Sequence, residues 1–124
     1  MGSTGAVQNA SGAAGPLSSD VVLMYLADQP HQEWITKIQA RYPGLEIRWV
    51  LSYADGARVP PETYGPEIWD GVTLMCCWWF PPPAELMSKV KFVQLTSAGT
   101  DPWVSHASFL DPNVVFCNGR GTNP

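Results

Sequence analysis

VTLMCCWWF, residues 72–80, is the most apolar stretch of the chain, and the prolines at positions 81–83 follow it directly. A continuous apolar run of this kind is typical of a strand that is covered on both faces of a parallel sheet. Proline cannot donate to the hydrogen-bond ladder of a sheet, so the strand should end where the prolines begin. We therefore expect residues 72–80 to form the central strand of the fold.

The residues before this strand predict two further strands and one helix. VVLMYL, residues 21–26, is a second continuous apolar run, and EIRWVL, residues 46–51, alternates in the manner of a half-exposed strand near a sheet edge. Between them, apolar side chains recur at helical spacing up to Pro43-Gly44, which predicts an amphipathic helix over residues 30–42. Residues 52–66 contain two Gly and three Pro, so we expect a loop there.

The residues after the central strand continue the alternation of strands and helices. We expect short helices over residues 84–90 and 103–110, and strands over residues 92–95 and 114–117. Strands separated by helices imply a parallel sheet with right-handed crossovers. The predicted fold class is thus α/β, a flavodoxin-like parallel sheet of about five strands with helices on both faces. No helix pattern follows the fifth strand, so we expect the sheet to be incomplete at its C-terminus and to leave an apolar face uncovered.

Composition and charge narrow the class of protein. The 124 residues, 45% of them hydrophobic, suit one small globular domain from residue 20 onward, and residues 1–19, which carry no charge, predict a disordered leader. A net charge of −4 provides no basic stripe for nucleic acid, so we expect no nucleic-acid partner. No apolar run approaches the ~18 residues of a membrane span, so we expect no membrane partner and a cytoplasmic location. The three cysteines have neither disulfide nor metal-ligand spacing, which predicts reduced, buried thiols and no metal site.

The turn after the fourth predicted strand is the strongest candidate binding site. Ligands of open α/β sheets bind at the carboxyl ends of the strands. There, the small residues Ser97-Ala98-Gly99 leave backbone N–H groups uncovered by side chains, and successive N–H groups form a concave site for an anion such as a carboxylate. The alternative interpretation is an ordinary tight turn in which Asp101 caps the next helix.

Other chemistry-bearing residues form weaker patterns. Trp78 and Trp79 could wall a binding pocket, although an aromatic pair in a central strand is also typical of a core. His31 and His106 have no neighbouring carboxylate to orient them, and we expect His106 on a solvated helix face. The chain contains no Ser/His/Asp set and no phosphate loop, so the sequence predicts no catalytic residues of its own.

Two segments give the chain a family resemblance. VKFVQLTSAGTD, residues 90–101, and VVFCNGRG, residues 114–121, resemble the D-isomer-specific 2-hydroxyacid dehydrogenases, and the resemblance covers residues 20–124. It implies that residues 20–124 are the flavodoxin-like substrate-binding domain of a two-domain enzyme. The backbone of Ala98 and Gly99, with Ser97, would hold the substrate carboxylate, and the loop of residues 78–80 would shape the side-chain pocket. Asn118, Gly119, Arg120 and Gly121 would form the hinge to a dinucleotide-binding domain.

The same resemblance implies a division of labour between two domains. The catalytic Arg, Glu and His of the family, and its G-x-G-x-x-G loop for NAD or NADP, lie in later sequence, so we expect this chain alone to bind no cofactor and to be inactive. The expected function is the substrate-binding part of an NAD(P)-dependent oxidoreductase that interconverts D-2-hydroxyacids and 2-ketoacids. Its expected partners are a small 2-hydroxy or 2-keto acid and a dinucleotide-binding domain. The alternative is a non-catalytic interaction module that docks a partner through its unfinished sheet.

Overall fold

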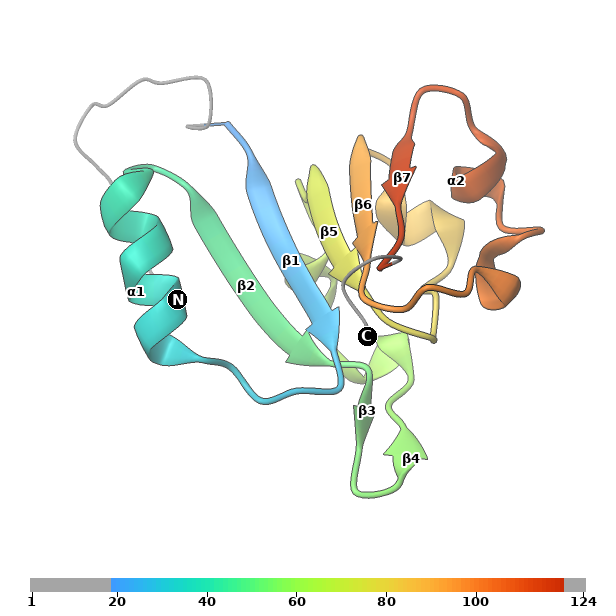
Figure 1. Cartoon of the computed structure of the whole chain (residues 1–124), viewed down its shortest axis with the longest axis horizontal. Helices are drawn as coiled ribbons and strands as arrows, with labels where there is room; N and C mark the ends of the chain where they lie inside the picture. Colours follow the sequence, from blue (N-terminus) through green and yellow to red (C-terminus); the bar gives the residue numbers. More distant parts are fainter. Residues whose placement is uncertain (1–18, 120–124) are drawn as a thin grey trace.

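A five-stranded parallel sheet forms the centre of the molecule (Figure 1). The computed structural model describes residues 19–119. All four neighbouring strand pairs are parallel. In their order across the sheet, the strands are β2 (Glu46–Leu51), β1 (Val21–Leu26), β5 (Leu74–Cys77), β6 (Phe92–Leu95) and β7 (Val115–Cys117). This order is that of flavodoxin-like sheets, in which the second strand lies outside the first. The α/β class, the parallel sheet and the central position of β5 are confirmed.

The predicted boundaries near the central strand are wrong in part. Strand β5 ends at Cys77, three residues before the predicted end of the central strand, so residues 78–80 lie outside the sheet. The predicted helix over residues 84–90 is one 3-10 turn, η3 (Ala84–Met87), because buried Val90 turns the chain back toward β6. The predicted helix over residues 103–110 is divided into η4 (Asp101–Trp103) and α2 (Ala107–Leu110). The predicted leader lies outside the described residues except for Ser19.

The segment predicted as a loop contains regular structure. Strands β3 (Tyr53–Ala54) and β4 (Ala57–Arg58) form an antiparallel hairpin, and two 3-10 turns follow, η1 (Pro61–Thr63) and η2 (Pro66–Ile68). Asp55 and Gly56 at the hairpin turn have φ values of 54° and 77°. A two-residue Asp-Gly turn with positive φ at both positions matches the twist of a hairpin. The Gly and Pro content of residues 52–66 therefore predicted a loop where the chain forms a hairpin and two 3-10 turns.

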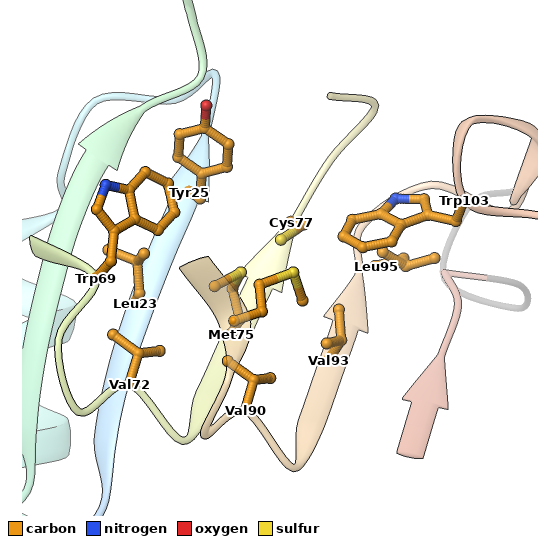
Figure 2. Packing of buried hydrophobic residues seen from close by; sticks show 11 residues of the cluster. Leu23, Tyr25, Trp69, Val72, Met75, Cys77, Val90, Val93, Leu95 and Trp103 are labelled. Carbon is orange, nitrogen blue, oxygen red and sulfur yellow. The ribbon is translucent and has the colours of Figure 1, made fainter. Parts of the chain in front are cut away.

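One face of the sheet carries the hydrophobic core (Figure 2). Leu23, Met75 and Val93 point from neighbouring strands into this face, and each is at most 2% exposed. The turns η2, η3 and η4 cover them, and Trp69 meets Tyr25 edge to face with ring centroids 5.2 Å apart. Trp103, which is fully buried, covers the end of the core beside Leu95 and Cys77. We call this side of the sheet the core face.

The opposite face carries α1 (Gln32–Arg41) and is covered only in part. Trp34 of α1 meets Trp49 of β2 edge to face, with ring centroids 6.2 Å apart, so helices lie on both faces as predicted. No residue of α1 is buried. The strand register places six side chains farther from α1 on this face, and none of them is buried: Leu74, Cys76, Phe92, Gln94, Val115 and Cys117. We call these six residues the α1-side face, and its exposure agrees with the predicted uncovered apolar surface.

Candidate functional site

Three loops meet at the carboxyl edge of the sheet, where β5, β6 and β7 end. Cys77 is in register with Leu95, so the loops that follow them start side by side. Backbone hydrogen bonds join these loops: the Thr96 N–H donates to the Cys77 oxygen at 2.9 Å, and the Gly119 N–H donates to the Ser97 oxygen at 2.7 Å. The turn of residues 97–99 is thus fixed by its neighbours on both sides.

The carbonyl oxygens of the turn are engaged in hydrogen bonds with neighbouring protein groups, whereas, in the part of the chain that the structure describes, its N–H groups are not. The Ser97 oxygen accepts from Gly119, the Ala98 oxygen from Asn118 Nδ2 at 3.3 Å, and the Gly99 oxygen from the Ser97 hydroxyl at 3.0 Å. Within residues 19–119, the N–H groups of Ser97, Ala98 and Gly99 have no acceptor. Ala98 and Gly99 are exposed. Unpaired N–H donors on successive residues are suited to an anion, and above all to a carboxylate.

The helix-cap alternative is not supported by the geometry around Asp101. Thr100 occupies the N-cap position of η4, Asp101 is its first residue, and the cap carries no side-chain hydrogen bond. Asp101 therefore does not organise the turn as a capping residue.

The two neighbouring tryptophans have different surroundings. Trp79 is 39% exposed, and its Cζ3 lies 3.4 Å from the position that a Cβ atom would take on Gly99. Trp78 instead belongs to an aromatic cluster, with its ring centroid 5.9 Å from that of Tyr53 and 5.6 Å from that of Phe80. Trp79 therefore lies against the turn, whereas the ring contacts of Trp78 are with Tyr53 and Phe80.

The cysteine thiols of β5 are unsuited to nucleophilic chemistry. Burial raises the pKa of Cys76 to about 11, and burial with the neighbouring Cys76 raises the pKa of the fully buried Cys77 well above its ordinary value. Both thiols therefore stay protonated near neutral pH. The expectation of buried thiols is confirmed for Cys77 alone: Cys76 is half-buried, and Cys117 is exposed because it lies on the edge strand and on the uncovered α1-side face.

His106 has a structural role that the sequence pattern did not reveal. Its Nδ1 accepts from the Ser108 N–H at 3.1 Å, and its Nε2 lies 2.6 Å from the Pro82 oxygen. The first contact requires Nδ1 to be unprotonated, so Nε2 carries the hydrogen and donates a hydrogen bond to the Pro82 carbonyl oxygen. The predicted solvated position is wrong, because the half-buried imidazole caps α2 and ties it to the loop after β5. His31 is exposed and lies 6.2 Å from the Trp49 ring.

A cleft beside the turn was not predicted. Its volume is about 620 Å³, and its walls include Leu95, Phe109 and Phe116, with Thr100 and Asn118 at the side of the turn. These residues come from positions 95–118 and gather only when β7 pairs with β6. Sequence spacing therefore contained no signal for the cleft.

The structure describes two of the four predicted hinge residues, Asn118 and Gly119. Asn118 and Gly119 are both bonded to the 97–99 turn, whereas Arg120 and Gly121 lie outside the described residues. A Cβ atom on Gly119 would lie 2.7 Å from the Thr96 oxygen, so only glycine fits this approach. The hinge role itself stays a prediction.

In the part of the chain that is described, no group of three or more His, Cys, Asp or Glu side chains could hold a metal ion. Between residues 19 and 119, no helix is long and apolar enough to cross a membrane. Comparisons with protein-family models, with curated proteins and with solved structures find no match to this chain. The fold and site define an α/β protein with an exposed array of N–H donors at the carboxyl edge of a parallel sheet.

Proposed function

We propose that this chain binds the carboxylate of a small 2-hydroxy or 2-keto acid on the turn of residues 97–99. The proposed role is the substrate-binding part of an NAD(P)-dependent D-2-hydroxyacid oxidoreductase. One observation supports it most directly: three successive N–H groups lack an acceptor within residues 19–119, at the edge of the sheet where α/β proteins bind ligands. The resemblance of residues 90–101 and 114–121 to this dehydrogenase family supplies the substrate class.

Each part of the site has a distinct proposed task. The N–H groups of Ser97, Ala98 and Gly99 donate to the carboxylate, and a hydrogen bond to a charged group contributes about 1.5–3 kcal/mol. Asn118 and Gly119 hold the carbonyl oxygens of the turn, so that its N–H groups stay directed toward the ligand. Trp79 flanks the ligand and limits the access of water from the β5 side.

The redox step belongs outside this chain. Hydride transfer needs a nicotinamide held against the substrate and an acid or base of suitable pKa. The sequence has no G-x-G-x-x-G loop, and within residues 19–119 no histidine or carboxylate side chain forms a hydrogen bond with the 97–99 turn. We therefore assign no nucleotide site to these residues, and we expect no change in nicotinamide absorbance when the chain is mixed with NADH and glyoxylate.

Carboxylate binding is tested by amide NMR with glyoxylate as the probe and glycolaldehyde as its uncharged counterpart. We expect glyoxylate to shift the amide signals of Ser97, Ala98 and Gly99, while glycolaldehyde leaves them in place. Ala98→Pro removes one donor and should weaken glyoxylate binding. Ala107→Pro is the matched control, because it changes another exposed alanine at the first residue of α2, where proline is tolerated. Equal shifts with both probes, or glyoxylate shifts confined to other residues, would exclude this function.

The α1-side face supports a second candidate function, the binding of an amphipathic helix. Leu74, Phe92 and Val115 align across three neighbouring strands, and parallel sheets are normally covered on both faces. The backbones of these strands are already hydrogen-bonded to each other, so a bound helix does not have to supply backbone hydrogen bonds to them. Three strands span ~10 Å, which is about the diameter of one helix. A chain that does not increase the fluorescence of a dye for exposed apolar surfaces would contradict this candidate.

A further inference from the structure

The cleft beside the 97–99 turn has the composition of a side-chain pocket. Leu95 at the end of β6, Val114 just before β7, Phe116 of β7 and Phe109 of α2 line it. The rings of Phe109 and Phe116 meet edge to face with centroids 4.9 Å apart. A volume of about 620 Å³ falls within the ~300–1,000 Å³ of small-molecule sites.

The cleft and the turn are parts of one continuous surface. Thr100, which directly follows Gly99, lines the cleft, and so does Asn118. The Nδ2 of Asn118 donates to the Ala98 oxygen, so this side chain joins the turn to the cleft wall. Adjacent Cα atoms are ~3.8 Å apart, so a ligand held on the Gly99 N–H begins within one residue of the cleft.

The walls of the cleft select among possible substituents. The two phenylalanine rings favour an aromatic or branched aliphatic group. Asp111 also lines the cleft, and its Oδ1 accepts from the Asn113 N–H at 2.9 Å. A second carboxylate on the ligand would be placed near this acidic side chain, and like charges repel. The cleft therefore suits acids with one carboxylate and an apolar substituent.

We propose that this cleft is the specificity pocket of the chain, and that its ligands are 2-keto or 2-hydroxy acids with an aromatic or branched aliphatic substituent. This inference rests on the proposed carboxylate site. It differs from the expectation that residues 78–80 shape the pocket, because Trp78 and Phe80 are packed against Tyr53, Trp79 lies beside Gly99, and none of the three lines the cleft. The carboxylate lies on the 97–99 amides, and the substituent extends past Thr100 toward Phe109.

The test compares three probes by amide NMR and titration calorimetry: glyoxylate, which has no substituent, phenylpyruvate, and oxaloacetate, which has a second carboxylate. We expect phenylpyruvate to bind at least tenfold more tightly than glyoxylate, and oxaloacetate to gain nothing over glyoxylate. Phenylpyruvate should also shift the amides of Thr100 and Phe109, which glyoxylate should leave in place.

Variants at two exposed apolar residues separate the cleft from the rest of the surface. Leu110 lines the cleft and is 65% exposed, so Leu110→Ser should fold normally. It should weaken phenylpyruvate about threefold or more and leave glyoxylate unchanged. Val104, 54% exposed and outside the cleft, supplies the control Val104→Ser, which should alter neither probe.

The possible failures are distinguishable. If glyoxylate shifts the 97–99 amides but phenylpyruvate binds no more tightly, the pocket assignment is wrong and the carboxylate site stands. Weaker phenylpyruvate binding in both serine variants would likewise exclude the cleft. If neither acid shifts those amides, both the pocket and the proposed function are wrong.

Discussion

Gly119 is the residue on which the geometry of the candidate site most depends. A Cβ atom there would lie 2.7 Å from the Thr96 oxygen and 2.9 Å from the Thr96 carbonyl carbon, and both atoms are backbone. Gly119→Ala should therefore push β7 away from the turn and lower the free energy of unfolding by about 1–3 kcal/mol. Thermal unfolding followed by circular dichroism measures this change.

A second glycine of the same site supplies the control for that experiment. At Gly99, the added Cβ would meet only the Trp79 ring, at 3.4 Å, which is an ordinary contact. Gly99→Ala should therefore leave the stability within about 0.5 kcal/mol of the parent chain. If the two alanine variants unfold at the same temperature, the close approach of Gly119 to Thr96 is not a constraint on the fold.

Asp20 makes the stability depend on acid pH. Its Oδ1 lies 3.0 Å from Lys91 Nζ and accepts from the Thr73 hydroxyl at 2.9 Å, so it joins the amino ends of three adjacent strands. The hydrogen bond from Lys91, helped by Thr73 and by the Lys91 charge, holds the pKa of Asp20 below its ordinary value of 3.8 although burial opposes this. The unfolded chain therefore binds the proton at a higher pH than the folded chain does.

The sign of this linkage predicts the effect of Asp20→Asn. The contribution of Asp20 is present above the unfolded pKa and is lost as pH falls through the lower folded pKa. We expect Asp20→Asn to be less stable than the parent chain at neutral pH. The difference should be only about 1 kcal/mol, because Lys91 is largely exposed. Below about pH 4, the variant should lose less stability than the parent chain does. Unfolding temperatures from neutral pH to about pH 2 measure both effects. Glu85→Gln, at an exposed carboxylate, should keep the pH profile of the parent chain, and parallel profiles for Asp20→Asn and the parent would refute the role of Asp20.

At the scale of elements, Arg48 connects strand β2 to the turn η2. Its Nη1 donates to the oxygens of Glu67, Ile68 and Asp70 at 2.8, 2.9 and 2.7 Å, and its Nε pairs with Glu46 at 2.8 Å. Arg48→Met should lower the free energy of unfolding by about 2 kcal/mol, because the carbonyl oxygens lose a charged donor. It should also speed hydrogen exchange at the Trp69 amide, which η2 protects.

The exposed Arg41 provides the matched comparison for Arg48. It ends α1, and its guanidinium lies 6.0 Å from the Tyr42 ring. Arg41→Met removes a charge from a solvent-exposed position and should change the stability by less than about 0.5 kcal/mol. An Arg48→Met variant as stable as Arg41→Met would show that the three carbonyl contacts do not hold η2 in place.

The elements that could be predicted from sequence are those whose pattern is local. Strands β1, β2 and β6 and helix α1 lie where apolar runs and helical spacing predicted them, because each pattern reports burial within one segment. The predicted short helices were too long. The end of a short turn depends on where the following residues pack, and after η3 the buried Val90 packs into the core. The Asp55-Gly56 hairpin had a local signal that composition alone conceals.

The candidate site shows the same division between local and distant determinants. The position of the 97–99 turn follows from the end of one strand and could be predicted. The separation of Trp78 from Trp79 depends on β5 ending at Cys77, and the cleft depends on Phe109 meeting Phe116 across different elements. Such contacts are produced by chain folding over long sequence separations, and no spacing rule in one sequence reports them.

At the scale of the whole molecule, the two faces of the sheet differ in how completely they are covered, and the three thiols report this difference. Cys77 points into the core face and is fully buried, whereas Cys76 and Cys117 lie on the α1-side face. Burial raises the pKa of Cys76 to about 11, so this thiol is almost entirely protonated at pH 8. Cys117 is exposed and can be reached directly.

We therefore expect iodoacetamide at about pH 8 to modify Cys117 first, Cys76 far more slowly, and Cys77 only when the core opens, because the thiolate is the reacting species. Mass spectrometry of proteolytic peptides measures the three rates, and Cys117→Ser isolates the slow reaction of Cys76. An amphipathic helix bound over the α1-side face should slow Cys117 and Cys76 and leave Cys77 unchanged, which makes Cys77 the internal control. Equal rates at Cys77 and Cys117 would mean that the core face is as open as the α1-side face, contrary to the packing described above.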